Sequence, residues 1–581
     1  MNNRHHRVRY DVIGEGVLSE HPTPAPTPKA GAEATDAATD PTSPDDEPDG
    51  APGPRFSRLG PTGSPVDVEV LRLLARTMTA APTAETPHPD AEGMPAGYTY
   101  LGQFVDHDLT LDLTPAAFGD PITDEDLRQG RTPTLDLDCL YGAGPWDARD
   151  DRLYVANPSD PHDHALLALG VTAPISPGEG PADEGTERAL AGYDLPRVAN
   201  GPDRATRQQA AIPDVRNDEN LIVAQTHLAF MRFHNRVVAD VRARGVRGPA
   251  VFTRARWRVT MHYQWMLWHD FLPRMVDPAI LDDVAAKGRT FVEPNAQGRG
   301  PATMPLEFSV AAYRIGHSMV RAAYSWNRIF TRDGGGGTAT LGLLFRFSGT
   351  SGGFVGDFEQ LPTNWAVDFR RLYDFREAGR PDLAPPDGVN PAKRIDTHVA
   401  DPLASLPPGS FGGTEPPADP DELNLAFRNL VRANMVRLAS GQQMAELMGE
   451  VPLSREQILQ GDGRGVRLPA KGEAADRFAA ATPLWFYVLR EAELADGRLS
   501  GVGGRIVAEV FHRAMENSRH SIVRTPGFRP DLGPDRSTFR MVDLLLHAFD
   551  EGAGVNPLGD EAVVPEGTQA AEGDDGELIA S

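Results

Sequence analysis

The sequence predicts a mainly α-helical domain with a few short strands. Apolar residues recur at helical spacing in segments near 98–110, 219–244, 252–270, 308–325, 421–448 and 503–515. No internal repeat with the period of a solenoid is present, which excludes a repeat architecture. Short strands are expected around the glycine-rich loop FSGTSGGF at 347–354.

Composition divides the chain into three parts. Residues 1–54 are rich in Pro, Ala, Asp and Thr and cannot bury a core, so we expect a disordered tail. Residues 55–550 form the predicted domain, because a chain of 581 residues with 40% hydrophobic content can build a sizeable core. Residues 551–581 are acidic and glycine-rich, and we expect a second flexible tail.

Charge and cysteine usage exclude several classes of protein. The formal net charge of −25 argues against a nucleic-acid partner, which would require a basic surface. A single cysteine, Cys139, excludes an intrachain disulfide framework. Neither a signal peptide nor a membrane-spanning apolar stretch is visible, so we expect a cytoplasmic protein, or one exported without a recognisable signal. The sequence does not indicate the oligomeric state.

The segment YTYLGQFVDHDLTLDLTP, residues 98–115, is the densest polar motif of the predicted helices. Helical geometry places Gln103 and His107 one turn apart on the same face, with Asp106 beside them. Asp108 lies on a different face, so this helix is expected to serve two sites. The alternative is a solvated helix that carries acidic residues by chance.

The segment RTPTLDLDCLYGAGP, which begins at Arg131, suggests a cation site. Its oxygen-bearing side chains alternate along the chain, and they belong to Thr132, Thr134, Asp136 and Asp138. An extended loop points alternate side chains the same way, and calcium needs six to eight oxygen ligands. Asp108 could complete such a shell. The alternative is an edge strand with a polar outer face.

A long helix is predicted in the segment IPDVRNDENLIVAQTHLAF, which begins at Ile212. Arg216 and Glu219 lie three residues apart near its start, and the simplest explanation of this spacing is an intrahelical ion pair worth about 0.2–0.5 kcal/mol. The same helix carries His227 and His234. Both are interpreted as structural, because neither has metal-ligand spacing with carboxylates.

Two further segments, each predicted to be helical, carry candidate ligand-binding residues. In the order Arg314, Ile315, Gly316, His317, a small residue precedes a histidine and leaves room for a flat ligand. The alternative is a core histidine whose hydrogen bonds are satisfied by the protein. The segment LAFRNLVRANMVRLASGQQMAELMG contains Asn429 and Arg432, again three residues apart.

Taken in this order, the five motifs resemble the animal haem peroxidase family, which includes myeloperoxidase, lactoperoxidase and the cyclooxygenases, and especially its bacterial members. The match rests on QxxDHD, TxTxDxD followed by YG, RxxE, RxGH and NxxR in sequence. It extends from about Arg55 through the segments TPLWFYVLREAEL and GVGGRIVAEVFHRAM. The resemblance implies the helical fold of that family, with haem held between core helices.

The resemblance also implies a role for each motif residue. On the distal side of the haem it implies a distal histidine, a distal arginine and a glutamine beside the peroxide or halide site, which are His107, Arg216 and Gln103. On the proximal side it implies an iron ligand and its hydrogen-bond partner, which are His317 and Asn429. It implies propionate-binding arginines, Arg314 and Arg432, and carboxylates that form ester links to haem, Asp106 and Glu219. The loop from Thr132 to Asp138, with Asp108, would bind calcium.

Two departures from the family pattern refine these expectations. Asn220 stands where myeloperoxidase has the methionine of its third covalent link, so at most two links are expected. Arg314 stands three residues before His317, where cyclooxygenases and fatty-acid dioxygenases have a radical tyrosine. Tyr313 is one residue away and is expected on another helical face, which favours a peroxidase over a dioxygenase.

The expected function is therefore that of a haem b peroxidase that reduces hydrogen peroxide while it oxidises a halide, phenol or other small donor. The resemblance implies that the haem is ester-linked through Asp106 and Glu219. One alternative is a fatty-acid or other lipid oxygenase of the same superfamily. Another is a non-catalytic adhesion or scaffold protein with the same fold. Peroxide defence under oxidative stress is one of several biological roles that the sequence leaves open.

Overall fold

The fold is mainly helical, as the sequence predicts. The computed structural model describes residues 54–560 except 177–179, 182–184, 301, 407–416, 418 and 470, together with the backbone of 8–9 and 18–19. The longer helices are α1 (Val68–Met78), α2 (Gly97–Leu109), α5 (Leu221–Ala243), α6 (Ala250–Met266), α8 (Pro278–Lys287), α11 (Leu425–Met435), α15 (Leu484–Leu494) and α16 (Gly501–Asn517). Shorter ones are α3 (Asp138–Tyr141), α4 (Arg204–Gln208), α7 (Leu272–Met275), α9 (Gly316–Met319), α10 (Leu341–Arg346), α12 (Gly441–Met448), α13 (Arg455–Gln460), α14 (Glu473–Ala480) and α17 (Met541–Ala548).

The strands of the described residues are short and form two-stranded pairs. The antiparallel pairs are β1 (Val8–Arg9) with β2 (Leu18–Ser19), β4 (Asp90–Pro95) with β12 (Pro391–Lys393), β5 (Tyr154–Val155) with β6 (Leu166–Leu167), β7 (Gly170–Val171) with β8 (Ala191–Asp194), and β10 (Ala323–Tyr324) with β11 (Ala339–Thr340). A parallel pair joins β3 (Arg55–Ser57) to β9 (Thr303–Pro305). The β10–β11 pair flanks residues 334–337. The strands expected around the loop at 347–354 are not found among the described residues, because α10 (Leu341–Arg346) precedes that loop and turns and bends form it.

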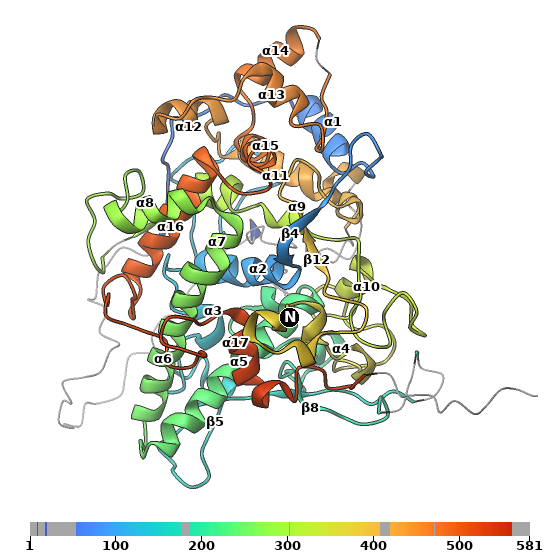
Figure 1. Cartoon of the computed structure of the whole chain (residues 1–581), viewed down its shortest axis with the longest axis vertical. Helices are drawn as coiled ribbons and strands as arrows, with labels where there is room; N and C mark the ends of the chain where they lie inside the picture. The colour runs from blue at the N-terminus through green and yellow to red at the C-terminus, as the bar shows by residue number, and fades with distance from the viewer. Residues whose placement is uncertain are drawn as a thin grey trace, which may run out of the picture.

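Helix α2 crosses the middle of the molecule, where Figure 1 shows it close to α9 and β4. It packs against α5 and α9, while α5 packs against α6 and α17. Tyr98, Leu101, Phe104 and Val105 are each no more than 1% exposed, so α2 is a core helix. Its polar side chains are therefore enclosed by protein rather than by solvent.

Two predicted helices are interrupted, and both breaks have a physical cause. The segment 308–325 is not one helix: a π turn at Phe308–Ala312 closes with the Tyr313 N–H bonded to the Phe308 carbonyl at 3.0 Å, and α9 follows. The segment 421–448 divides into α11 and α12. Between them Arg437 has φ +49°, and Ser440 caps α12 through a reciprocal capping box with Gln443.

The long helix predicted at 219–244 begins at Leu221, because Asn220 caps it with a side chain that accepts the Val223 N–H at 3.0 Å. The preceding residues form a 3₁₀ turn, Val215–Asp218, so Arg216 lies outside the long helix. The helices predicted at 98–110, 252–270 and 503–515 are confirmed as α2, α6 with a π turn at Leu267–Phe271, and α16.

The packed residues extend beyond the C-terminal boundary of 550 that the sequence predicts. The predicted N-terminal tail falls outside the described residues except for residue 54 and the β1 and β2 backbone, and residues 561–581 fall outside them entirely. Residues 551–560 are packed: Val555 is 1% exposed, and its carbonyl accepts the Phe369 N–H at 2.9 Å. Within the part of the chain that the structure describes, none of the helices is both long and apolar enough to cross a membrane.

Candidate functional site

The polar motif of α2 is buried, which rules out the solvated-helix alternative. Gln103 and Asp106 are each 5% exposed, His107 is fully buried and Asp108 is 1% exposed. Burial of polar groups costs free energy unless hydrogen bonds or ligands replace water. The partners of these side chains therefore decide what the helix does.

A single asparagine that the sequence analysis did not single out holds His107. Asn217 Oδ1 lies 2.8 Å from His107 Nδ1, and Asn217 Nδ2 lies 3.0 Å from Nδ1 of His227. With the carbonyl oxygen facing His107, Nδ1 is the donor and Nε2 keeps its lone pair. His107 Nε2 is buried and has no hydrogen-bond partner among the described residues.

Arg216 reaches the same region from the 3₁₀ turn. Its ion pair is with Asp214, whose carboxylate accepts from Nε at 3.0 Å and from Nη2 at 2.7 Å. Nη2 also donates to the backbone carbonyls of His107 and Thr110, at 3.1 and 2.7 Å. Nη1 is buried and, within the described residues, has no hydrogen-bond partner. The Arg216 guanidinium is thus held against α2, and its Nη1 is available to a ligand.

Gln103 connects α2 to the start of α5. Its Nε2 donates to Glu219 Oε2 at 3.2 Å, and its Oε1 accepts from Asn220 Nδ2 at 2.9 Å. Asn220, the residue that departs from the myeloperoxidase pattern, thus fixes the glutamine as well as capping the helix. The structure therefore brings Gln103, His107, Arg216 and Glu219 together as predicted.

Burial and charge set the protonation of this group. Burial, followed by the positive charge of Arg216, lowers the pKa of His107 to about 3, so its imidazole is neutral near pH 7. Burial raises the pKa of Asp106, while Arg314 and Arg216 oppose that rise. Burial also opposes ionisation of Asp214, but Arg216 and Arg131 outweigh it and hold its pKa well below the usual range.

His317 and Asn429 form the predicted pair. His317 lies on α9 and is 1% exposed, and Nδ2 of the Asn429 amide on α11 lies 2.6 Å from its Nδ1. For Asn429 to accept the imidazole N–H, as the motif implies, its amide must be turned so that Oδ1 faces Nδ1. The Trp485 indole packs edge-on against the imidazole, with ring centroids 6.0 Å apart, and donates to the Arg314 carbonyl at 3.2 Å. The orientation of His317 is therefore set by a hydrogen bond and an aromatic contact.

A pocket lies between α2 and the segment that carries His317. Its lining is Tyr98, Thr99, Gly102, Gln103, Asp106, Phe271, Met275, Tyr313, Arg314, Ile315, Gly316, His317 and Met319. Four predicted site residues are among them. Asp106 Oδ2 and Arg314 Nη1 are buried and lack a hydrogen-bond partner among the described side chains and backbone, whereas Arg314 Nε donates to the Ser309 carbonyl at 2.7 Å. Polar groups of opposite charge thus reach an otherwise largely apolar pocket.

Tyr313 is not where a straight helix would place it. The π turn inserts a residue into the helical register, which rotates the following side chains around the axis. As a result Tyr313 lines the pocket with His317, and its buried hydroxyl has no hydrogen-bond partner within the described residues. The expectation that Tyr313 faces away from the site is wrong.

Arg432 contacts a residue that the sequence analysis left out. Its guanidinium forms an ion pair with Asp112, just beyond the end of α2. The predicted propionate-binding arginine therefore has a protein carboxylate beside it. Asp112 is the first acidic residue after the QxxDHD motif, but nothing in the sequence connects it to α11.

The loop predicted to bind calcium closes on α2 through Asp108. The carboxylate of Asp108 accepts the Leu137 and Cys139 N–H groups at 3.1 and 3.3 Å, and burial followed by nearby Asp138 raises its pKa to about 7. Asp138 pairs with Arg256 at 3.1 Å. The loop is not an edge strand, since residues 131–137 form turns and bends before α3.

Some oxygens of this loop are free to bind a cation, and others are already hydrogen-bonded to the protein. Two of its buried oxygens, Thr134 Oγ1 and Asp136 Oδ1, have no hydrogen-bond partner among the described residues. Asp136 Oδ2, however, accepts the Arg519 N–H at 2.8 Å, and the Thr132 carbonyl accepts the Thr134 N–H at 2.7 Å. Among the described residues, no group of three or more His, Cys, Asp or Glu side chains has a metal-binding arrangement.

A mainly helical domain that buries two histidines on two packed helices, each held through Nδ1 by an asparagine, has the features of a haem-binding protein. Residues 185–336 match the family model for animal haem peroxidases. This match supports the family that the motifs of the chain predict. A comparison with curated protein sequences finds no match.

Solved structures with a similar course of the chain include peroxidases and dioxygenases. Peroxidase A from Dictyostelium discoideum is 15% identical, with 84% of this chain and 92% of that chain covered and a TM-score of 0.49. A fatty acid alpha-dioxygenase from Arabidopsis thaliana is 12% identical, with 86% and 76% covered and a TM-score of 0.48. The Oryza sativa fatty acid alpha-dioxygenase is 11% identical, with 86% and 80% covered and a TM-score of 0.47.

Proposed function

We propose that the protein is a haem peroxidase that reduces hydrogen peroxide and oxidises a halide, a phenol or another small donor. One observation carries the proposal. Four buried polar atoms without a hydrogen-bond partner among the described residues belong to side chains that the family motif assigns to the haem site: His107 Nε2, Arg216 Nη1, Asp106 Oδ2 and Arg314 Nη1. Buried polar groups are nearly always satisfied, so this set fits a polar prosthetic group and its substrate.

The residues present fit haem by their chemistry. His317 would supply a nitrogen ligand to the iron, and Asn429, with its amide turned so that Oδ1 accepts the Nδ1 proton, would fix the tautomer that leaves Nε2 free to bind. Arg314 would pair a propionate. When bound, haem supplies the iron that accepts oxidising equivalents from peroxide and passes them to the donor. Every other requirement of the reaction falls on protein side chains.

The distal side chains suit proton transfer from peroxide. His107 is neutral near pH 7 and presents Nε2 as an acceptor, so it can take a proton from one peroxide oxygen and return it to the other. Arg216 holds a fixed positive charge beside it, which stabilises negative charge as the O–O bond breaks. The low basicity of His107 makes its role that of a short-lived proton carrier rather than a group that stays protonated.

We also propose ester links from Asp106 and Glu219 to haem, as the family motif implies. The two carboxylates reach the site from α2 and from the residue before the α5 cap, and Gln103 contacts Glu219 directly. Asn220 supplies no sulfur, so a third link is not proposed.

A calcium ion at the loop of Thr132, Thr134, Asp136 and Asp138, with Asp108, remains part of the proposal. Its support is the pair of unpartnered buried oxygens and the raised pKa of Asp108, which a cation would lower. Metal analysis of purified protein tests it. About one calcium per chain, with a melting temperature that falls in strong chelator, would support the site, and absence of both effects would refute it.

One observation favours the dioxygenase as a second candidate. Tyr313 lines the same pocket as His317, with an unpartnered buried hydroxyl, so a tyrosine is available beside the site despite the shifted sequence position. The scaffold alternative gains no such support, because a protein without catalytic activity has no reason to bury the charged side chains of Asp106, Arg216 and Arg314.

Optical spectroscopy of the purified protein before and after peroxide, followed by a donor screen, tests the proposed function. A Soret band that responds to peroxide, with turnover of iodide, bromide or phenols, would support the peroxidase. Oxygen uptake on unsaturated or saturated fatty acids without turnover of those donors would favour the dioxygenase. Purified protein that binds no haem would favour the non-catalytic scaffold alternative.

A further inference from the structure

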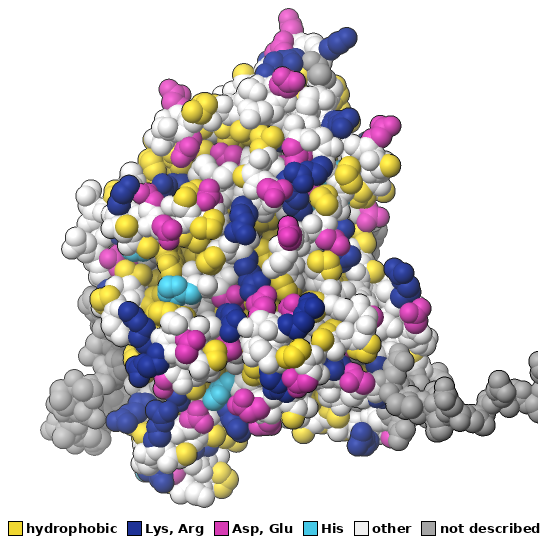
Figure 2. All heavy atoms as spheres, in the orientation of Figure 1, with side chains coloured by type: hydrophobic (Ala, Val, Ile, Leu, Met, Phe, Trp, Pro, Cys, Tyr) yellow, Lys and Arg dark blue, Asp and Glu magenta, His cyan; other side chains and the backbone are white. Residues whose placement is uncertain are grey.

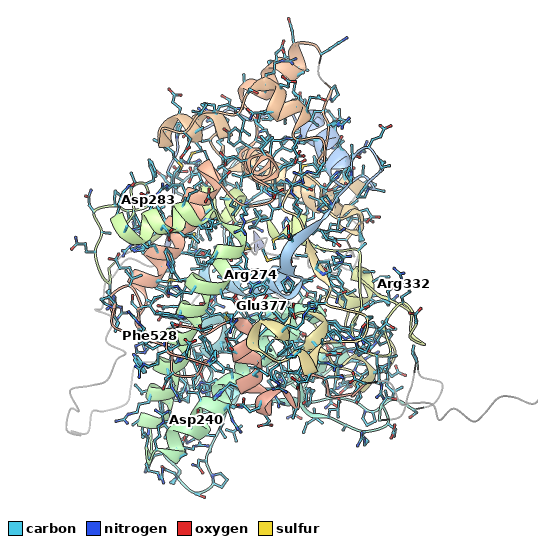
Figure 3. All side chains as sticks on the ribbon, viewed as in Figure 1. Asp240, Arg274, Asp283, Arg332, Glu377 and Phe528 are labelled. Atoms are coloured by element: carbon cyan, nitrogen blue, oxygen red, sulfur yellow. The ribbon has the colours of Figure 1, made fainter. Side chains whose placement is uncertain are left out.

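A second hollow opens on the surface in front of the pocket. It has a volume of about 540 Å³, and its lining includes Glu92, Asp270, Arg274, Glu377, Arg498 and Arg540. Figure 2 shows basic and acidic side chains gathered in the middle of this face, where Figure 3 labels Arg274 and Glu377 next to each other. Arg274 bonds both Asp270 and Glu377, at 2.8 and 2.5 Å. The acidic members of the hollow are therefore largely neutralised.

One stretch of chain forms the wall between this hollow and the pocket. Phe271 and Met275 line the pocket, whereas Asp270, Pro273 and Arg274 line the hollow. These residues belong to the π turn at Leu267–Phe271 and to α7, so alternate sides of a single helical stretch face the two spaces. Figure 1 shows α7 beside α2.

Tyr98 connects the pocket to the hollow through this wall. It is 1% exposed and lines the pocket from the first turn of α2, while its hydroxyl donates to Asp270 Oδ2 at 2.7 Å. Asp270 in turn lines the hollow. The Tyr98–Asp270 hydrogen bond thus connects the pocket to the hollow. A phenol that loses an electron also loses its proton, and the Asp270 carboxylate is placed to accept that proton.

The surroundings favour oxidation of Tyr98. The Arg274 guanidinium lies 4.2 Å from the ring centroid, and its charge is paired with the carboxylates of Asp270 and Glu377. Tyr313 also lines the pocket, yet its hydroxyl has no acceptor among the described residues. Of the two pocket tyrosines, only Tyr98 is shown with a base for its proton.

We propose that Tyr98 is a redox relay through which phenols too large for the pocket are oxidised at the surface hollow. The inference rests on the proposed peroxidase function, since hydrogen peroxide supplies the oxidising equivalents. In the first step Tyr98 gives one electron to the oxidised prosthetic group and its hydroxyl proton to Asp270. In the second step a phenol in the hollow gives one electron to the Tyr98 radical, Asp270 returns its proton to Tyr98, and the phenol proton passes to solvent. One phenol is oxidised to a phenoxyl radical per relay cycle.

Phenols are the fitting class of donor because of their chemistry. A tyrosyl radical exchanges an electron and a proton with another phenol at little net cost, as the bonds broken and formed are of the same type. Iodide has no proton to exchange and is small enough to enter the pocket directly. The relay therefore predicts a dependence on donor size that applies to phenols and not to halide.

The experiment compares three donors on the full-length haem-loaded protein: iodide, free phenol, and phenol coupled to a long polyethylene glycol chain. In Tyr98→Phe, the ratio of kcat/KM for the tethered phenol to that for iodide should fall about tenfold or more. Tyr100→Phe is the matched control. Tyr100 lies on the same helix, is 1% exposed and bonds Tyr324 at 2.8 Å, but lines neither space, so its ratio should stay within about twofold of wild type.

Radical trapping gives a readout independent of turnover and of variant folding. After peroxide is added to wild-type protein without donor, a nitroso spin trap should form an adduct that mass spectrometry locates on Tyr98. An adduct confined to Tyr313 or another residue overturns the relay. So does turnover of iodide but not of tethered phenol, or an unchanged donor ratio in Tyr98→Phe. If wild-type protein oxidises none of the three donors with peroxide, the peroxidase proposal itself fails, and the relay fails with it.

Discussion

Asn217 holds the imidazole of His107 in the form that can accept a proton. The 2.8 Å contact between Asn217 Oδ1 and His107 Nδ1 places the imidazole proton on Nδ1, and the 3.0 Å contact of Nδ2 with His227 fixes the amide the right way round. The role of His107 as a base therefore depends on a neighbour that is 110 residues away in sequence. Asn217 acts as a positioning residue.

Replacing Asn217 by leucine should slow the reaction with peroxide without loss of haem. Leucine has a similar size but cannot accept the Nδ1 proton, so the imidazole populates the wrong tautomer. The rate constant for peroxide should fall about 10–100-fold, as is typical for loss of an orienting contact. Stopped-flow spectroscopy measures it. Asn235→Leu, which removes the bonds of α5 to Leu167, is the control and should leave that rate constant unchanged.

His317 should be needed to hold haem. His317 lines the pocket and contacts Asn429 at 2.6 Å, and the family motif implies that it is the iron ligand, so His317→Ala should lose haem or shift its Soret band strongly. His234→Ala is the matched control, because His234 is also fully buried and hydrogen-bonded, to Tyr141 and to the Ala165 carbonyl. A wild-type spectrum and turnover in His317→Ala would show that the iron ligand lies elsewhere.

The sequence predicts what depends on local spacing and misses what depends on tertiary contacts. The period of apolar residues locates α2 and α16, and the QxxDHD spacing places Gln103 and His107 on one face. The π turn before α9 has no such signal, so Tyr313 was assigned to the wrong side. The same limit applies to Asn217 and to the Asp112–Arg432 pair, whose partners come from distant segments and whose residue types are common on surfaces.

Acid should destabilise the protein through its buried histidines. Burial lowers the pKa of His234 to about 4, below the value near 6.5 of an unfolded chain. Between these two pH values the unfolded state binds more protons, so the free energy of unfolding falls as pH drops from about 6.5 to about 4. The slope contributed by one such histidine is at most about 1.4 kcal/mol per pH unit.

Denaturant titrations of the protein without haem at a series of pH values measure this slope. In His234→Gln, which does not titrate in this range, the fall in unfolding free energy between pH 6.5 and 4 should be smaller than in wild type. The same slope in both proteins would mean that His234 is not buried in its neutral form. Above about pH 7 the free energies of unfolding of wild type and His234→Gln should differ by an amount that does not depend on pH.

Covalent attachment of haem gives the last prediction. Asp106 lines the pocket with an unpartnered carboxylate oxygen, and Glu219 contacts Gln103 on the same face of α2, so both carboxylates are placed to react at the haem edge. Ester formation is an oxidation, for which peroxide supplies the equivalents, so freshly made protein should carry partly unlinked haem and peroxide should raise the linked fraction. Acidic organic extraction followed by mass spectrometry measures that fraction.

Asp106→Asn combined with Glu219→Gln keeps the size of both side chains but removes the nucleophilic oxygens, and should make the haem fully extractable again. Glu307→Gln is the control at a buried carboxylate that does not line the pocket and accepts the Leu59 and Gly60 N–H groups, and it should leave the linked fraction unchanged. If peroxide-treated wild-type protein releases all its haem as unmodified cofactor, the two carboxylates serve only to hold the pocket.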